Sequence, residues 1–167
     1  MMLDLSLRGV DGARHSLASL TGRTATVVVF VSNGCPTVRA YEERLKTLQA
    51  TWRAQGVNVI AINANNPYLS PPDTFRETVK RARERQYNFS CLKDEQGVVA
   101  KAFGAICTPH VFVLDHEQRI VYQGRIDDSR LGTTITRRDL ENAIADLVAG
   151  RPVTVPETDP FGCGIVW

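Results

Sequence analysis

The chain has 167 residues, of which 43% are hydrophobic and 23% are charged, and this size and balance predict one globular domain that buries its own core. Twenty Lys and Arg residues against 18 Asp and Glu residues give a formal net charge of +2, which is too small to indicate a nucleic-acid or membrane-surface partner. The first residues lack the basic start and apolar stretch of a secretory signal, and no apolar run is long enough to span a bilayer, so we expect a cytoplasmic protein.

The apolar pattern predicts that the chain begins with β-structure. Leu3, Leu5 and Leu7 alternate with polar residues, as in a half-buried strand, and a turn is expected at 10–12. The continuous apolar run 25–31 then predicts a strand that is buried on both faces.

A helix is predicted to follow that buried strand. Pro36 suits its first position, because the N–H that proline lacks would be unsatisfied there anyway. Apolar residues then recur at steps of three and four, which gives the helix one buried stripe. Gly56 is expected to end this region, and 57–63 has the pattern of a second strand, so the unit is a βαβ unit with parallel strands. The stripe consists of Val38, Tyr41, Leu45, Leu48 and Trp52.

The second half of the chain predicts shorter elements in a mixed order. A loop rich in Asn and Pro, 63–72, leads to a helix that Asp73 is expected to cap. Two later apolar runs, separated by five polar residues, predict an antiparallel hairpin. The expected elements are a helix ending near Gln86, a short strand at 89–92, a short helix at 96–103, hairpin strands at 111–114 and 120–122, and a last helix at about 137–148.

These elements together predict a mixed sheet with helices on both faces. We expect a single domain over residues 1–150, followed by a C-terminal tail, 151–167, that contains three prolines and packs on the domain.

Cys35 is the residue with the strongest chemical signal. It follows the predicted strand and the short turn 32–34, and it stands where the predicted helix begins. Unpaired N–H groups and the helix dipole favour negative charge at that position, so the thiol pKa is expected to lie below its ordinary value of about 8.5. The sequence thus predicts a nucleophilic thiolate, with an inert buried thiol as the alternative.

The other cysteines are Cys91, Cys107 and Cys163, and four cysteines so widely spaced do not form the disulfide framework of a small secreted protein. In a reducing compartment they are expected to be free unless the chemistry of the protein oxidises them. Cys91 lies in a short apolar run and is expected to be a small core side chain.

Several stretches resemble a peroxiredoxin-like subgroup of the thioredoxin-fold proteins, within the alkyl hydroperoxide reductase and thiol-specific antioxidant (redoxin) family. They are Ser32 to Glu42 with its single-cysteine Cys-Pro-Thr-Val motif, Lys93 to Glu95, Cys107 to Asp115, Gly124 to Asp128 and Gly162 to Ile165. The resemblance implies an α/β, thioredoxin-like fold with an N-terminal β extension, and a thiol-dependent oxidoreductase that needs no cofactor.

The same resemblance implies that the Thr108–Pro109 peptide bond is cis and faces Cys35. In family terms this loop exposes a main-chain edge that docks a substrate chain, and it keeps metal ions away from the thiolate. The resemblance therefore makes Cys35, Pro36, Thr108 and Pro109 the catalytic candidates. A trans proline that opens a strand is the simpler alternative.

The sequence departs from the family patterns at two positions. Val38 stands where a dithiol thioredoxin has its second cysteine, so that route of intramolecular resolution is absent. Ser32 fits the hydroxyl position of a peroxiredoxin signature, but Val28 replaces the expected proline. Ser32 and Arg125 could still orient a peroxide, although Arg125 also fits a surface role at the end of the hairpin.

Once Cys35 has reacted, a second thiol must resolve the sulfenic acid or mixed disulfide. Cys107 is the best internal candidate because its loop approaches the helix start, although it also fits a buried structural cysteine, and Cys163 is another candidate if the tail folds back. Resolution by glutathione or a thioredoxin would need neither. His110 could supply a proton near Cys35 or point away from it.

The leading hypothesis is therefore a thiol oxidoreductase that acts on a peroxide or a disulfide and takes electrons from a thioredoxin or a low-molecular-weight thiol. The first alternative is a redox-inert binding module that recognises an extended peptide at the Thr108–Pro109 edge. A metal site formed by Cys107, His110 and Cys35 is disfavoured, because four tetrahedral ligands are not evident and Pro109 would block access. Sequence alone does not separate peroxidase activity from disulfide exchange.

Overall fold

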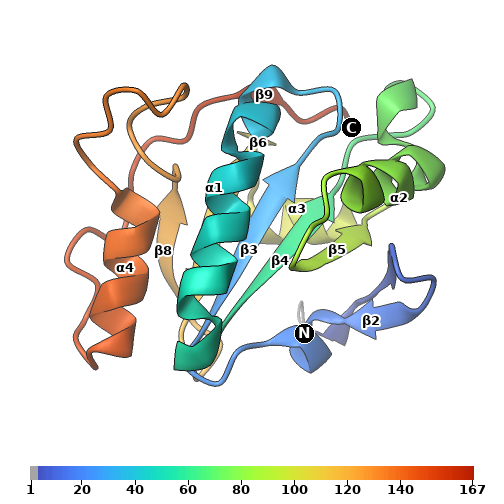
Figure 1. Ribbon diagram of the computed structural model, residues 1–167. Helices are drawn as coiled ribbons and strands as arrows, with labels where there is room; N and C mark the ends of the chain where they lie inside the picture. The colour runs from blue at the N-terminus through green and yellow to red at the C-terminus, as the bar shows by residue number, and fades with distance from the viewer. Residues whose placement is uncertain (1–3) are drawn as a thin grey trace.

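The computed structural model describes residues 4–167, which form a mixed sheet of seven strands in the order β2-β1-β5-β4-β3-β7-β8, with helices on both faces (Figure 1). This architecture is the predicted thioredoxin-like one. No helix within the described range is both long and apolar enough to cross a membrane.

The centre of the sheet is the predicted βαβ unit. β3 (Ala25–Val31) is buried along its whole length and pairs in parallel with β4 (Val57–Asn63). α1 (Pro36–Trp52) connects them, and Gly56 turns the chain out of the short 3-10 helix η3 (Arg53–Gln55) with a φ of 82°. Because both strands run the same way, the loops after them meet at one edge of the sheet.

The sheet extends on both sides of this unit. β5 (Ser90–Lys93) is parallel to β4, whereas β7 (His110–Leu114) is antiparallel to β3 and continues into the predicted hairpin with β8 (Ile120–Gly124). The switch from parallel to antiparallel pairing places the start of β7 beside the end of β3. This is the edge at which Cys35 lies.

At the N-terminus the observed strand is shorter than the predicted one. β1 (Ser6–Gly9) pairs with β2 (Arg14–Ser16) across the predicted turn, and Leu7 is buried. Leu5 is 36% exposed, so its predicted inward position is wrong, because the strand begins only after it. Leu3 lies outside the described residues.

The helix predicted to be capped by Asp73 is capped by the next residue instead. α2 (Phe75–Glu84) begins after Thr74, whose Oγ1 accepts a hydrogen bond from the Glu77 N–H at 3.2 Å. Asp73 is completely buried at the end of the 3-10 helix η4 (Pro71–Asp73). Its carboxylate accepts hydrogen bonds from the loops after β3 and β4, as described below. The remaining helical elements are η2 (Leu17–Leu20), α3 (Val98–Phe103) and α4 (Asp139–Val148).

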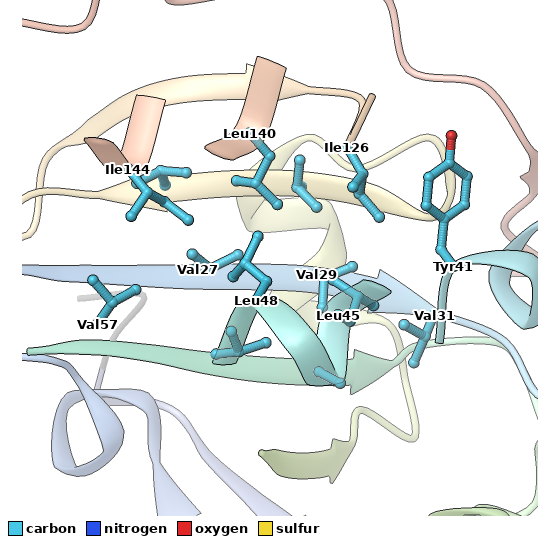
Figure 2. Packing of buried hydrophobic residues seen from close by; sticks show 14 of the residues in the cluster. Val27, Val29, Val31, Tyr41, Leu45, Leu48, Val57, Ile126, Leu140 and Ile144 are labelled. Carbon is cyan, nitrogen blue, oxygen red and sulfur yellow. The ribbon is translucent and has the colours of Figure 1, made fainter. Parts of the chain in front are cut away.

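Side chains from the two faces of the sheet form two hydrophobic clusters. Val27 and Val29 point toward α1 and α4, where they meet Leu45 of α1 and Leu140 of α4 (Figure 2). Val28 and Phe30, which alternate with these valines in β3, point to the opposite face, where Phe30 packs against Phe103 of α3 and Phe112 of β7. Burial on both faces holds β3 rigidly, and Cys35 follows from its end.

The tail, residues 151–167, returns from α4 along the end of the sheet. The Gln123 N–H donates to the Pro156 carbonyl at 3.0 Å, and Thr158 packs against Gly124 of β8. Farther on, β9 (Cys163–Gly164) pairs antiparallel with β6 (Cys107–Thr108) in a separate two-stranded sheet. In Figure 1 this segment passes the first turn of α1, where Cys163 meets Cys35.

Candidate functional site

Cys35 lies at the N-cap of α1, between the end of β3 and the first helical residue, Pro36. Its N–H donates to the Ser32 carbonyl at 3.4 Å, which closes the turn after β3. The residue is only 2% exposed. The rigid strand and the helix start thus fix the sulfur in a protected position next to the free N–H groups of the first helical turn.

Two other segments meet the Cys35 sulfur. It lies 3.3 Å from the Thr108 carbonyl oxygen and 2.7 Å from the Cys163 sulfur. The Thr108–Pro109 peptide bond is cis, as predicted. The structure therefore brings together the helix start, the cis-proline loop and the C-terminal tail, which are far apart in the sequence.

The environment lowers the pKa of Cys35 below its ordinary value. Burial is the largest single influence and opposes the charge, but hydrogen bonds from the Cys163 side chain, from the Thr108 side chain and from the Val38 N–H together outweigh it. Val38 stands three positions after Cys35, so this N–H belongs to the first helical turn. The sequence-based expectation of a stabilised thiolate agrees with this direction.

The pKa of Cys163 moves the other way, to about 11, because burial, its hydrogen bond to Cys35 and the negative charge of Cys35 all favour the neutral thiol. The Thr37 N–H and the charge of Arg130 act weakly in the opposite sense. The opposite directions of the two pKa shifts mean that, of the two sulfurs, Cys35 is the one that loses its proton first.

The remaining cysteines lie in different environments. Burial and the nearby charge of Cys35 raise the pKa of Cys107 to about 11, and its sulfur is 4.0 Å from the Pro109 carbonyl oxygen. Cys91 is buried in the core beneath α1, and burial raises its pKa strongly. Of the two resolving candidates, Cys163 is the one in contact with the Cys35 sulfur.

The other supporting candidates have partners of their own. Ser32 Oγ donates to Asp73 Oδ2 at 2.9 Å, and Arg125 Nε donates to Asp139 Oδ2 at 2.7 Å. His110 accepts a hydrogen bond from the Ile106 N–H and its ring packs on Phe112, on the face opposite Cys35. Burial lowers the pKa of His110 to about 4, so this imidazole is neutral at physiological pH.

Asp73 was not recognised from the sequence as part of the site, yet it joins the two loops that follow β3 and β4. Its carboxylate is fully buried, and hydrogen bonds overcome the burial that would raise its pKa, so the pKa lies below the ordinary value. The sequence did contain a signal for a polar cluster here, because polar residues follow the carboxyl ends of the two parallel strands β3 and β4. Its donors are Ser32 Oγ, the Asn33 N–H, Asn63 Nδ2, Asn65 Nδ2 and Ser70 Oγ, at 2.6 to 2.9 Å.

The same asparagine loop holds the end of the tail. The Val166 N–H donates to Asn65 Oδ1 at 3.0 Å, and the Asn66 N–H donates to the Val166 carbonyl at 2.7 Å. Asn65 thus contacts both the tail and Asp73, which in turn holds the Ser32–Asn33 turn before Cys35. Sequence reasoning gave this loop no role.

The site residues are thiols, hydroxyls and main-chain groups rather than a ligand set for a metal. Within residues 4–167 there is no cluster of three or more His, Cys, Asp or Glu side chains arranged to hold an ion. The geometry instead suits nucleophilic sulfur chemistry, since an activated thiolate and a second thiol lie in contact.

Comparison with known proteins places the chain in a family. Residues 1–123 match the AhpC/TSA family. The chain belongs to the AhpC/TSA family. Its general function is accordingly thiol-dependent redox chemistry, as a thiol oxidoreductase or peroxidase. A search of curated proteins finds no match.

Several solved structures have a similar fold. An uncharacterized conserved protein from Geobacillus kaustophilus is 36% identical, with a TM-score of 0.92 over 98% of this chain and 88% of that one. Peroxidoxin BcpB from Mycobacterium tuberculosis is 20% identical, with a TM-score of 0.67 over 88% of this chain and 93% of that one. A secreted M. tuberculosis disulfide oxidoreductase homologous to E. coli DsbE is 18% identical, with a TM-score of 0.64 over 89% of this chain and 97% of that one. The last two show the shared fold.

Proposed function

We propose that this protein is a two-cysteine thiol oxidoreductase in which Cys35 attacks the oxidant and Cys163 resolves the product as an intramolecular disulfide. The observation that supports it is the 2.7 Å separation of the two sulfurs. A disulfide has an S–S bond of about 2.05 Å, so a small movement is enough to form it. No partner thiol has to enter the site for resolution.

With a peroxide, the Cys35 thiolate attacks one oxygen, the O–O bond breaks, and the leaving alkoxide or hydroxide takes a proton and departs as alcohol or water. Cys35 is now a sulfenic acid. The Cys163 sulfur attacks the Cys35 sulfur, the S–O bond breaks, and water leaves with the Cys163 proton. With a disulfide, Cys35 forms a mixed disulfide and releases one thiolate, and Cys163 then releases the second thiol.

The charge on Cys35 determines which of the two thiols reacts first. While Cys35 is an anion, its charge and hydrogen bond keep the Cys163 proton in place. Once Cys35 has been oxidised that charge is gone, so Cys163 ionises more readily when its attack is needed. Cys163 is therefore a poor competitor for the first step and a better nucleophile for the second.

An external thiol closes the cycle by reducing the Cys35–Cys163 disulfide. We infer a reductant of the thioredoxin or glutathione type in a reducing, cytoplasmic setting, because the free thiols depend on such an environment. Cys163 is the more exposed of the two sulfurs and is the expected point of attack. This route serves both peroxide and disulfide substrates.

The test is intact-protein mass spectrometry after a stoichiometric dose of hydrogen peroxide or 2-hydroxyethyl disulfide. The native chain should lose two hydrogen atoms, and peptide mapping should place the new bond between Cys35 and Cys163. The Cys163→Ser variant should stop at the sulfenic acid or the mixed disulfide, and Cys35→Ser should react with neither reagent. Cys91→Ser serves as a matched control and should behave as the native chain.

Two results would count against this mechanism. An unmodified native chain would favour the redox-inert binding module. A disulfide that includes Cys107 in place of Cys163 would transfer the resolving step to the cis-proline loop.

A further inference from the structure

The tail occupies the main-chain edge beside Cys35. β9 pairs antiparallel with β6, with Cys163 opposite Thr108 and Gly164 opposite Cys107, and the Ile165 N–H adds a bond to the Ile106 carbonyl at 3.3 Å. An extended polypeptide recognises an exposed strand edge through the same main-chain groups. The tail and an incoming extended peptide therefore compete for one edge.

Gly162 is the residue that allows this close fit. A Cβ atom at this position would lie 1.9 Å from the Thr108 carbonyl oxygen and 3.3 Å from Pro109 Cδ, and its φ of 151° is one that other residues rarely adopt. By contrast, a Cβ at Gly164 would meet no heavy atom within 4 Å. A side chain at Gly162 must therefore push the tail away from the cis-proline loop, whereas one at Gly164 need not.

The far end of the tail is anchored independently. Ile165 is buried in the cluster beneath α3, and Val166 is held by Asn65 and Asn66. Trp167 lies over Gly97 and stacks with Lys101, whose Nζ is 5.2 Å from the ring centroid. These contacts hold the segment on the domain even before a bond forms between the two sulfurs.

We propose that the C-terminal segment 162–166 is a specificity element that covers the β6 edge and restricts Cys35 to small oxidants by excluding extended polypeptide disulfides. This inference rests on the proposed reaction of Cys35. Its physical basis is that Cys35 is 2% exposed and that the docked tail takes the main-chain groups that an extended substrate would use. Gly162 is then a positioning residue, because it acts through the tail.

The test compares two disulfides with the same leaving group. One is 2-hydroxyethyl disulfide, and the other is an extended octapeptide whose central cysteine is joined to 2-mercaptoethanol. In each case the Cys35 thiolate attacks one sulfur, the S–S bond breaks and 2-mercaptoethanol leaves as the thiolate. All proteins carry Cys163→Ser, so that only the first step is measured, by the rate of adduct formation on Cys35.

Adding Gly162→Ala should raise the rate with the peptide relative to the small disulfide by about tenfold, as expected when one or two main-chain hydrogen bonds of the tail no longer have to be broken by the substrate. Gly164→Ala adds the same methyl group in open space and should leave this ratio within about twofold of its parent. A Val166→Pro variant removes the N–H that reaches Asn65 and should raise the ratio in the same direction as Gly162→Ala. It decides the test if Gly162→Ala does not fold.

The proposal is overturned if Gly162→Ala and Val166→Pro, when folded, leave the ratio of the peptide rate to the small-disulfide rate unchanged. That includes the case in which both rates rise by the same factor. That result is distinct from a failure of the proposed function, since it is compatible with a Cys35–Cys163 disulfide in the native chain. An equal rate of the parent protein with both reagents would also contradict it.

Discussion

The hydrogen bond between Cys35 and Cys163 links the reactivity of one residue to the presence of the other. Burial by itself would suppress the thiolate of Cys35, and hydrogen bonds to the sulfur reverse that effect. One of those bonds comes from the helix start, which any thioredoxin-like cysteine has. Another comes from Cys163, in a tail that lies 128 positions away in the sequence.

Replacing Cys163 with Ala should therefore raise the pKa of Cys35, because the anion loses a hydrogen-bond donor while the helix start remains. The rate of Cys35 alkylation by iodoacetamide at neutral pH should fall several-fold, and the midpoint of its pH profile should move to higher pH. The Cys163→Ser variant keeps a donor and should recover part of the shift. Cys107→Ala is the matched control, since Cys107 donates to Pro109 rather than to Cys35. An unchanged profile in Cys163→Ala would mean that the helix start alone stabilises the anion.

At the scale of the elements, the loops after β3 and β4 are held by one carboxylate. Asp73 accepts hydrogen bonds from both loops, and Asn65 extends this network to Val166 in the tail. The buried side chain of Lys93 lies close by, and its Nζ donates to Asn63 Oδ1 at 3.0 Å. The position of Cys35 thus depends on a polar cluster located behind its turn.

The Asp73→Asn variant should destabilise the protein by about 3 kcal/mol or more, because an amide in place of one carboxylate oxygen leaves buried donors without an acceptor. The measurement is urea unfolding of the reduced chain. Asp159→Asn is the matched control at an exposed position of the tail and should change stability by less than about 0.5 kcal/mol. Equal stability of the two variants would show that Asp73 does not support the loops.

The pH dependence of this contribution has a definite sign. The folded-state pKa of Asp73 lies below its ordinary value of 3.8, so the folded chain binds fewer protons than the unfolded chain in that region. Its stabilising effect is complete above pH 3.8 and is lost as the pH falls through the lower, folded-state pKa. Compared with Asp73→Asn, the native chain should lose more stability on acidification.

The elements could be predicted because their signals are local. The apolar run 25–31, Pro36 and the hairpin residues define strands and a helix by patterns of a few residues. Asp73 was misassigned because Asp is a good helix cap by local rules, and only the folded chain shows that Thr74 caps α2 while Asp73 points inward. The thioredoxin-like resemblance placed Thr108 and Pro109 opposite Cys35, but sequence reasoning preferred Cys107 as the resolving thiol, whereas Cys163 is the one that contacts the Cys35 sulfur. That contact depends on Gly162 and Asn65, whose roles arise from tertiary contacts.

At the scale of the whole molecule, the contact between the two sulfurs joins the turn after β3 to strand β9 of the C-terminal tail. A bond between Cys35 and Cys163 would close a loop of about three-quarters of the chain, since 128 positions of the 167 separate them. The folded state already holds both residues in place through β9 and the asparagine loop. Oxidation therefore restricts mainly the unfolded chain.

The oxidised protein should accordingly be more stable than the reduced protein by about 5 kcal/mol, as the chain-entropy argument gives for a loop of this length. The measurement is urea unfolding of the native chain after stoichiometric oxidation and after full reduction, with free thiols counted before each run. Cys163→Ser cannot form the bond and should unfold at the same urea concentration under both treatments. If oxidation lowers the stability of the native chain, the tail must leave its docked position when the disulfide forms, and the contacts of Gly162 and Val166 would then belong to the reduced state alone.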